Sequence, residues 1–393
     1  MDFITACTMD CPYACSLVVS KTSGGTIRIR GNPDHPITAG VICGKVKKHP
    51  ERLTSPRRKV HPMIRKGDEW KKISWDSALD LCAENIERYR DEPSSILHVH
   101  GEGAKGVLKQ AGKFFFGRLG ACRLRGSLCD AAGFMAHIHD FGSRSNPDPR
   151  DLLNSRSIVN WGKDLSRSSI HLAAFVQKVR KTGIKMLTIS PGGDGNTHFS
   201  DDTIRIRPGT DRFLAAAVVR RLIDKDAVSE KVLSSAKNWE KFKQLVTKVS
   251  AAEMLKHCDV SEEKLQKLLN YYTLKNPTAT IIGAGLQRYD YGGENVRYIN
   301  ALAMISGNIG RSGGGSYFHL DSLRNFNLDW VNSSGLKGRR SFLEPLIGRE
   351  IESADPPVRM IWVNGSNIVN QAPDIRKTAG AFGNVDFKVV VDA

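Results

Sequence analysis

The sequence of 393 residues lacks any hydrophobic run that approaches the roughly 18 residues a membrane-spanning helix needs. Its N-terminus also lacks the basic and apolar regions of a secretion signal, and it has no twin-arginine motif. We therefore expect a cytoplasmic protein that does not insert directly into a membrane. The length is too great for one simple core and predicts two or three domains.

Aromatic residues are scarce, at 7% of the chain, whereas 58 lysines and arginines outnumber 41 acidic residues. The resulting formal net charge of +17 has three interpretations: a well-solvated surface, nucleic-acid binding, or neutralisation of an anionic cofactor or an acidic electron-transfer partner. No basic motif is interleaved with aromatic residues, so we expect no nucleic-acid partner. The densest basic run, "KVKKHPERLTSPRRK" (Lys45 to Lys59), begins two residues after a cysteine.

The eight cysteines do not suggest a disulfide framework, which belongs to small secreted chains. The first four form the pattern C-x3-C-x3-C-x27-C, at Cys7, Cys11, Cys15 and Cys43. Zinc sites usually pair their cysteines at a spacing of C-x2-C or near it. Radical enzymes that bind S-adenosylmethionine use three cysteines with a shorter second gap. Three clustered thiols with a remote fourth favour a [4Fe–4S] cubane, because each iron takes one cysteine.

The chain also lacks the G-x-x-x-x-G-K-[ST] motif, so a Walker loop is not supported. After a small N-terminal lobe, a helix is predicted from about Asp76, as an N-cap candidate, to Arg90. "SSILHVHGEG" then predicts a buried strand that runs into a glycine-rich turn. From there strands and helices alternate to the end, which predicts an α/β fold with parallel sheets covered by helices.

Five predicted strands end in glycine-rich or small polar turns: "NWGKD", "ISPGG", "RPGTD", "GAGLQ" and "VNGSN". Ligands of open α/β sheets lie outside the carboxyl ends of the strands, where free amides and helix N-termini favour phosphates. Five such turns in order suggest a large phosphate-bearing ligand spread over two sheets.

This ordered series resembles the catalytic subunits of the molybdopterin oxidoreductases, the dimethyl-sulfoxide-reductase/formate-dehydrogenase superfamily. The similarity extends from "GNPDHPITAGVICGK" through "LAMISGNIGRSGGG" to "MIWVNGSNIVNQAPD" and covers nearly the whole chain. It implies a [4Fe–4S] cluster and a molybdenum or tungsten ion held by two molybdopterin guanine dinucleotides. It also implies a cluster-binding lobe at 1–55, an αβα domain from 56–124 with 313–393, and a Rossmann-like domain at 125–312.

The resemblance assigns roles to individual residues. Cys7, Cys11, Cys15 and Cys43 match the cluster ligands, and Lys45 matches a lysine between cluster and pterin, where a fixed cation eases the addition of an electron.

Cys129 falls at the position of the metal ligand, with Cys122 as the alternate. A soft thiolate suits such a metal, whereas buried cysteines are often simple core residues. Asp130 replaces the histidine that usually follows the ligand in formate dehydrogenases, which puts formate in doubt. His137 or His139 could carry a proton, although such histidines are more often structural.

The dinucleotide contacts follow in the same way. The first dinucleotide is expected at the turns after successive strands, where Asp164 and Leu165 replace the family's Asn and Pro and where Asp211 can accept from a guanine edge. These positions are Gly162, Lys163, Asp164, Ser190, Pro191, Pro208, Gly209, Thr210 and Asp211, with Gly283, Gly285 and Gln287 near the pterin. The second dinucleotide is expected at Asn364, Gly365, Ser366 and Asn367.

The sequence stops at "FKVVVDA", where the family continues into further α/β structure and a C-terminal β-barrel domain. We therefore expect a fragment or a split enzyme, partnered by a second chain that supplies the rest or by an iron–sulfur electron-transfer subunit. The expected function is two-electron redox chemistry on a small-molecule substrate. The alternatives are a non-redox tungsten hydratase, a cluster-carrying electron-transfer scaffold without the metal site, and a zinc-stabilised nucleic-acid binder. The intact series of dinucleotide-binding turns disfavours the scaffold and the nucleic-acid binder.

Overall fold

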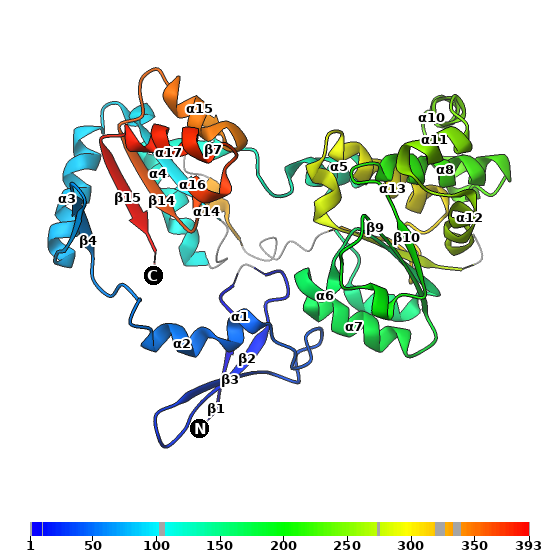
Figure 1. Ribbon diagram of the computed structural model, residues 1–393, viewed down its shortest axis with the longest axis horizontal. Helices are drawn as coiled ribbons and strands as arrows, with labels where there is room; N and C mark the ends of the chain where they lie inside the picture. The colour runs from blue at the N-terminus through cyan, green and yellow to red at the C-terminus, as the bar shows by residue number, and fades with distance from the viewer. Residues whose placement is uncertain are drawn as a thin grey trace. The chain divides into compact units, whose positions relative to one another are not determined.

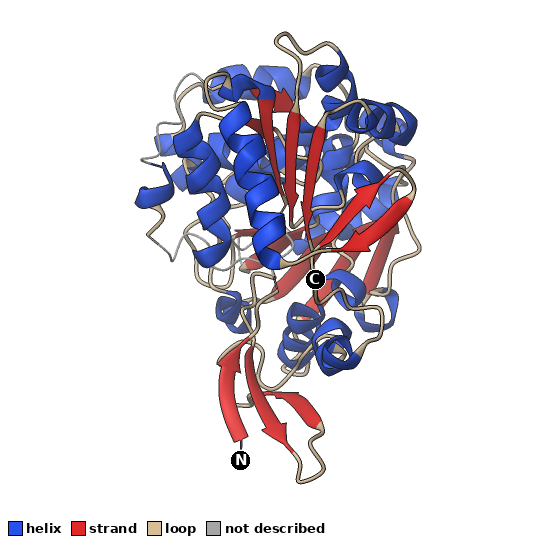
Figure 2. Cartoon of the chain, turned by 90° about the vertical axis from the view of Figure 1, so that its left-hand side faces the viewer, coloured by secondary structure: helices blue, strands red, loops and turns tan. Residues whose placement is uncertain are grey.

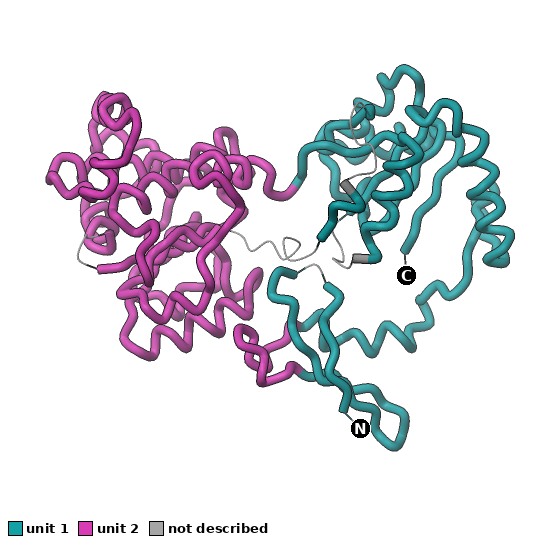
Figure 3. The backbone as a smooth tube through the Cα atoms, turned by 180° about the vertical axis from the view of Figure 1, so that it is seen from behind, with its two compact units in different colours: residues 1–30, 44–128, 322–393 teal, residues 31–43, 129–321 magenta. Residues whose placement is uncertain are grey.

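The computed structural model describes residues 2–9, 11–101, 107–272, 276–318, 327–332 and 339–392. Its contacts divide the chain into two compact units (Figure 3). Unit 1 contains residues 1–30, 44–128 and 322–393, and unit 2 contains residues 31–43 and 129–321. The predicted boundaries of a separate lobe at 1–55 and of two interleaved domains stay a prediction.

Unit 1 contains a three-stranded sheet (β1-β2-β3), a hairpin (β4-β5) and a five-stranded sheet in the order β13-β7-β6-β14-β15 (Figures 1 and 2). Its strands are β1 (Asp2–Ala6), β2 (Ser16–Lys21), β3 (Ile27–Gly31), β4 (Met63–Lys66), β5 (Glu69–Lys72), β6 (Ile96–His100), β7 (Cys122–Arg125), β13 (Ser341–Leu343), β14 (Met360–Asn364) and β15 (Phe387–Val391). Its helices are α1 (Gly44–Lys47), α2 (His49–Thr54), α3 (Trp75–Arg88), α4 (Ala111–Leu119), α14 (Asp329–Asn332), α15 (Ile347–Glu352), α16 (Ile368–Gln371) and α17 (Ile375–Gly383).

Unit 2 contains a five-stranded sheet in the order β10-β9-β8-β11-β12. Its strands are β8 (Ser157–Trp161), β9 (Lys185–Ser190), β10 (Asp202–Arg205), β11 (Thr278–Ile282) and β12 (Ser316–Tyr317). Its helices are α5 (Ala131–Phe141), α6 (Leu165–Ser168), α7 (Ile170–Arg180), α8 (Asp211–Asp224), α9 (Glu230–Ser235), α10 (Trp239–Thr247), α11 (Ala251–Cys258), α12 (Glu262–Tyr271) and α13 (Gly292–Ile305).

All pairings within the two five-stranded sheets are parallel. Their central strands are largely buried on both faces, as expected for strands covered by helices. In unit 2, α8 and α13 lie on one face and α6 and α7 on the other (Figure 1). In unit 1, α15 and α17 pack on one face through Leu97 and Ile361, and α3 and α4 pack on the other through Ile96 and Met360. The predicted α/β class with parallel sheets is confirmed.

Two local predictions need comment. The helix predicted at Asp76–Arg90 is present as α3, but Asp76 is not its N-cap: Ser74 caps it, with the Ser77 amide donating to the Ser74 hydroxyl oxygen at 3.1 Å. The strand in "SSILHVHGEG" is β6, and the turn predicted to follow it lies outside the described residues from 102 onward.

The parallel strands of unit 2 are held so closely that their turns touch. A Cβ atom at Gly283, after β11, would lie 2.2 Å from the carbonyl oxygen of Gly162, after β8. The Gly162 amide donates to the Ile189 carbonyl at 2.8 Å, and the Gly283 amide donates to the Trp161 carbonyl at 2.7 Å. Only a glycine at position 283 lets the two turns approach in this way.

We expect Gly283→Ala to lower the free energy of unfolding by about 1–3 kcal/mol, because the added methyl group forces the two turns apart. Gly285→Ala is the matched control, since a Cβ atom there meets nothing within 4 Å. Urea-induced unfolding of both variants measures the effect. Equal losses in the two variants would contradict the steric explanation.

Candidate functional site

The turns predicted to bind the first dinucleotide lie along one edge of the unit 2 sheet. Because its strands are parallel, their carboxyl ends all meet there. The structure places Gly162 to Asp164 after β8, Ser190 at the end of β9, Pro208 to Thr210 beyond β10, and Gly283 and Gly285 after β11. The sequence prediction that these segments share one edge is therefore met by the topology, whereas their role as ligands stays a prediction.

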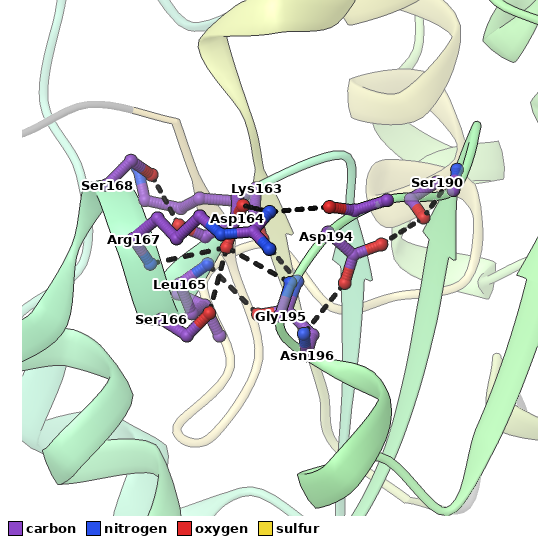
Figure 4. Close-up of polar contacts among 12 residues, drawn as sticks. Lys163, Asp164, Leu165, Ser166, Arg167, Ser168, Ser190, Asp194, Gly195 and Asn196 are labelled. Carbon is purple, nitrogen blue, oxygen red and sulfur yellow. Dashed lines mark hydrogen bonds and ion pairs between the residues drawn. The ribbon is translucent and has the colours of Figure 1, made fainter.

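The loops after β8 and β9 are joined to each other (Figure 4). The Asp164 carboxylate accepts from the Ser166 hydroxyl at 3.0 Å, the Arg167 guanidinium at 3.1 Å and the Gly195 amide at 3.4 Å. Asp164 thus also caps α6 through the Arg167 amide. The aspartate that departs from the family's asparagine has a structural function in this loop.

The second loop is closed in the same manner. The Ser190 hydroxyl donates to the Asp194 carboxylate, which also accepts from the Asn196 amide at 2.8 Å. The Arg167 guanidinium reaches across to the carbonyl of Gly193. The Ser190 hydroxyl is therefore already hydrogen-bonded to Asp194. Its predicted contact with a ribose requires this bond to be shared or broken.

Lys163 lies in the loop after β8 and contacts the loop after β9. Its carbonyl oxygen accepts from the side-chain amides of Asn160 at 2.9 Å and Asn196 at 2.8 Å, which fixes the backbone. Its side chain is half-buried, and loss of water around the ammonium group lowers its pKa to about 8. Across the described residues this ammonium group has no carboxylate partner in an ion pair. A desolvated cation at this edge fits a phosphate group, which would supply the missing negative charge.

Asp211 is the first residue of α8 and is only 5% exposed. Burial raises the pKa of its carboxyl group to about 6, against smaller lowering effects from its own amide and from Arg212. The preceding turn needs Gly209, which has a φ of +76°, and the Thr210 hydroxyl donates to the Arg207 carbonyl at 2.6 Å. The turn holds a buried carboxyl group at a helix N-terminus, where it can accept hydrogen bonds from a base edge.

Gln287, in the 3-10 helix η5 (Ala284–Arg288), links β11 to helix α5. Its side-chain oxygen accepts from the Gly133 amide, and a Cβ atom at Gly133 would collide with Gln287 and Phe318. The Gln287 Nε2 group is buried and, within the described residues, has no hydrogen-bond acceptor. Buried amide donors without partners are costly, so this one fits an acceptor atom of a bound group.

The two candidates for the metal ligand differ sharply. Cys129 is exposed, just before α5, and the Arg288 guanidinium approaches its sulfur at 3.7 Å. Cys122 is buried at the start of β7, where its thiol donates to the Ser94 carbonyl at 3.1 Å and burial raises its pKa to about 11. Cys122 is thus a protonated core residue, and its surroundings favour Cys129 as the accessible thiol.

Arg288 is a residue that the sequence analysis did not single out. It directly follows the predicted turn "GAGLQ", so its position was visible but its proximity to Cys129 was not. The two residues are separated by 159 positions in the sequence.

His137 has the surroundings of a structural histidine. It is 1% exposed, its Nε2 group donates to the Ser145 carbonyl at 3.1 Å, and its ring packs against Phe141 and Phe318. Burial lowers its pKa, which keeps it neutral. These contacts do not support its predicted catalytic role, which stays untested; His139 follows on the same helix and is exposed.

The N-terminal cysteines lie on a hairpin. The Cys7 amide donates to the Cys15 carbonyl at 2.8 Å between the end of β1 and the start of β2, and the Ala14 amide donates to the Cys11 carbonyl at 3.3 Å. Cys43 directly precedes α1, which carries the exposed Lys45, and belongs to the 31–43 segment of unit 2.

None of the eight cysteines, all of which are described, forms a disulfide. In the described part of the chain no group of three or more His, Cys, Asp or Glu side chains is arranged to hold a metal ion. The predicted four-thiol cage is therefore not seen as a closed set. The donor chemistry of the hairpin fits a cluster, and the ligand assignment stays a prediction.

The second set of turns lies at the carboxyl ends of β6 and β14. A Cβ atom at Gly101 would lie 2.1 Å from the carbonyl oxygen of Gly365, which has a φ of +68°. Burial lowers the pKa of His98 to about 4, and its neutral ring donates to the Asn364 Oδ1 atom at 2.7 Å. This hydrogen bond orients the Asn364 amide and was not predicted from the sequence.

The two neighbouring positions of this predicted set lie on the following turn and helix. The Ser366 hydroxyl donates to the Gln371 side chain at 3.1 Å, and Asn367 precedes α16. The loops thus form a second strand-end edge, in unit 1.

Comparison with known proteins decides the family. Residues 58–393 match the family "Molybdopterin oxidoreductase", and residues 3–55 match the "Molybdopterin oxidoreductase Fe4S4 domain". The chain belongs to the molybdopterin oxidoreductase family. The predicted molybdopterin and [4Fe–4S] cofactors are those of the two matched families.

Individual proteins agree with this assignment. The chain is 33% identical to the probable oxidoreductase YyaE of Bacillus subtilis, over 99% of this chain and 59% of that protein. It is 23% identical to the F420-dependent formate dehydrogenase subunit alpha of Methanocaldococcus jannaschii, over 97% of this chain and 60% of that protein. The chain thus spans about three fifths of the length of these relatives.

A solved structure shows the same fold. The acetylene hydratase from Pelobacter acetylenicus aligns with a TM-score of 0.80 and 17% identity, over 98% of this chain and 60% of that one. Among the residues described, no helix is both long and apolar enough to cross a membrane.

We expect Asp211→Asn to remove a pH-dependent penalty. The carboxyl group has a pKa of about 6 in the folded chain and about 3.9 when unfolded. Between these values the folded state binds more protons, so wild-type stability falls as pH rises from about 4 to 6. The variant lacks this fall, and its stability relative to wild type therefore increases across that range.

Urea unfolding of the cofactor-free chain at pH 4.5 and pH 7 measures this difference. The control is Asp226→Asn, because Asp226 lies at an exposed turn. Asp202→Asn is unsuitable because the Tyr271 hydroxyl donates to the Asp202 carboxylate. A relative stability that does not change with pH would show that Asp211 is not perturbed.

Proposed function

We propose that the protein is a molybdenum- or tungsten-dependent oxidoreductase that carries out two-electron chemistry on a small molecule and relays the electrons through a [4Fe–4S] cluster. The observation that supports this best is the edge of the unit 2 sheet. A desolvated Lys163, a buried Asp211 and a Gln287 amide with no acceptor in the described residues lie at or just beyond the strand ends. These groups complement phosphate, base and pterin acceptor atoms respectively.

We further propose that 125–312 binds one molybdopterin guanine dinucleotide and that 56–124 with 313–393 binds the other. The second edge, with Asn364 oriented by the neutral His98, supports this division. The relatives' greater length makes a further chain or segment a proposed partner, alongside an iron–sulfur electron-transfer subunit.

In this proposal Cys129 ligates the metal, which when bound supplies oxygen-atom or hydride and proton chemistry. The protein's own groups position the site: Arg288 donates to the thiol sulfur, and Gln287 ties the first turn of α5 to η5. Lys45 places a cation next to Cys43 in the sequence, where it offsets the charge of an added electron.

The likeness to acetylene hydratase supports the fold and does not favour hydration, because the identity is 17%. The electron-transfer scaffold alternative predicts iron without molybdenum or tungsten. Elemental analysis of the complete enzyme, purified without oxygen, separates these possibilities from zinc binding.

We expect Cys11→Ser to reduce the iron content of the purified protein well below the value of about four per chain that a [4Fe–4S] cluster gives. Cys82→Ser is the matched control, because Cys82 lies on α3, half-buried and outside the hairpin. Iron analysis and the visible absorbance of the cluster measure the effect. Zinc in place of iron in the wild-type protein would refute the cluster assignment.

We expect Cys129→Ser to lower bound molybdenum or tungsten, or to reduce turnover at least tenfold, because a serine oxygen replaces the soft thiolate. Iron should remain unchanged. Arg288→Lys tests the positioning contact separately and should change the metal's spectroscopic signature without loss of iron. Unaltered metal content, spectrum and activity in Cys129→Ser would assign the ligand elsewhere.

A further inference from the structure

The segment after Cys43 forms an exposed cationic surface, which we call the basic face. It consists of Lys45, Lys47, Lys48, Arg52, Arg57, Arg58 and Lys59. All seven side chains are exposed, and Glu51 is the one acidic residue in the run. Within the part of the chain that the structure describes, none of the seven forms an ion pair. Elsewhere exposed arginines commonly do, as in the pairs of Arg30 with Asp2 and Arg65 with Asp68.

Part of the basic face lines a hollow, through Arg52, Arg57 and Arg58. Ile27 and Ile29 from β3 line it, and so does Leu53 from α2, which is 55% exposed. A lining that combines apolar side chains with arginines is typical of a protein-docking surface and differs from that of a merely solvated charged segment.

The hollow also borders the cysteine hairpin. Thr8 lines it and directly follows Cys7, whose amide is bonded to Cys15. A protein seated in the hollow therefore lies against the segment that carries three of the predicted cluster ligands. Electron transfer between proteins needs such proximity, because its rate falls steeply with distance.

We propose that the basic face and its hollow dock an acidic, one-electron carrier protein. This inference rests on the proposed function and specifies the partner's charge and its docking position. After docking, the reduced carrier would lose one electron to a cluster held by Cys7, Cys11, Cys15 and Cys43; no bond is made or broken and no proton moves. Arg52, Arg57 and Arg58 attract the carrier's carboxylates, and Leu53 contacts its apolar centre.

Two other anionic partners fit the chemistry less well. The run Lys45–Lys59 contains no Phe, Tyr or Trp on which nucleic-acid bases could stack. Helix α2 has six residues, of which Leu53 is the one large apolar side chain, so it lacks the broad apolar face of a membrane-surface helix.

The test uses the full chain with its cluster and, as the probe, an acidic [2Fe–2S] ferredoxin. The variant Arg52→Glu/Arg57→Glu/Arg58→Glu is compared with Lys241→Glu/Lys243→Glu/Lys248→Glu. The control residues lie on and just after α10, and their exposed side chains form no ion pair with any described residue. The control makes the same change in net charge. Thermal unfolding of both variants confirms that they fold.

We expect the arginine variant to bind ferredoxin at least tenfold more weakly at low salt, mainly through a slower association rate. The difference from wild type should shrink as the salt concentration rises. Stopped-flow reduction of the protein by reduced ferredoxin should slow in parallel, whereas the lysine control should behave as wild type. Leu53→Asp should weaken binding while leaving the seven cations in place.

Equal ferredoxin binding by wild type and the arginine variant, or an equal loss in the control, would overturn the proposal. The proposal would also be overturned if the protein did not bind ferredoxin but used these arginines to bind DNA or anionic phosphatidylserine vesicles. Dithionite reduction and iron analysis distinguish failure of the proposed function from failure of the docking proposal. Absence of a reducible iron cluster defeats the proposed function, whereas a normally reducible cluster with unchanged ferredoxin binding defeats the docking proposal alone.

Discussion

The constraint on which each candidate edge depends is the contact between backbone turns at the ends of neighbouring parallel strands. In unit 2 the turn of Gly283 lies against the carbonyl of Gly162, and in unit 1 Gly101 lies against Gly365. No side chain can enter either contact. The same chemistry, a missing Cβ atom, thus lets two loops come together at each strand-end edge.

The polar groups at the unit 2 edge are costly without a ligand. Burial lowers the pKa of Lys163 and raises that of Asp211, and the Gln287 amide lacks an acceptor in the described part. In the proposed function, a phosphate would offset the charge of Lys163, a base edge would donate to Asp211 and a pterin acceptor atom would pair with the Gln287 amide. Binding of the proposed cofactor would then stabilise the folded state.

One residue of the family's motif differs in this chain and stabilises a loop. At position 164 an aspartate replaces the expected asparagine, and its carboxylate holds Ser166, Arg167 and Gly195. The loop after β8 is thus secured by charge, and the neighbouring Lys163 supplies a cation that faces no carboxylate partner in the described residues. The family resemblance alone does not reveal that Asp164 stabilises the loop.

The sequence by itself determined the α/β class, the order of the strand-end turns and the cysteine spacing, because each depends on local pattern: hydrophobic strands, glycine punctuation and residue count. It also placed Cys129 and Gln287 in motifs. Only the tertiary structure decided that Cys122 is a core thiol and that Arg288 approaches Cys129. It likewise revealed His137 packed between aromatic rings and His98 bonded to Asn364. These outcomes join residues up to 266 positions apart, and burial and contact over such separations are properties of packing that no local pattern contains.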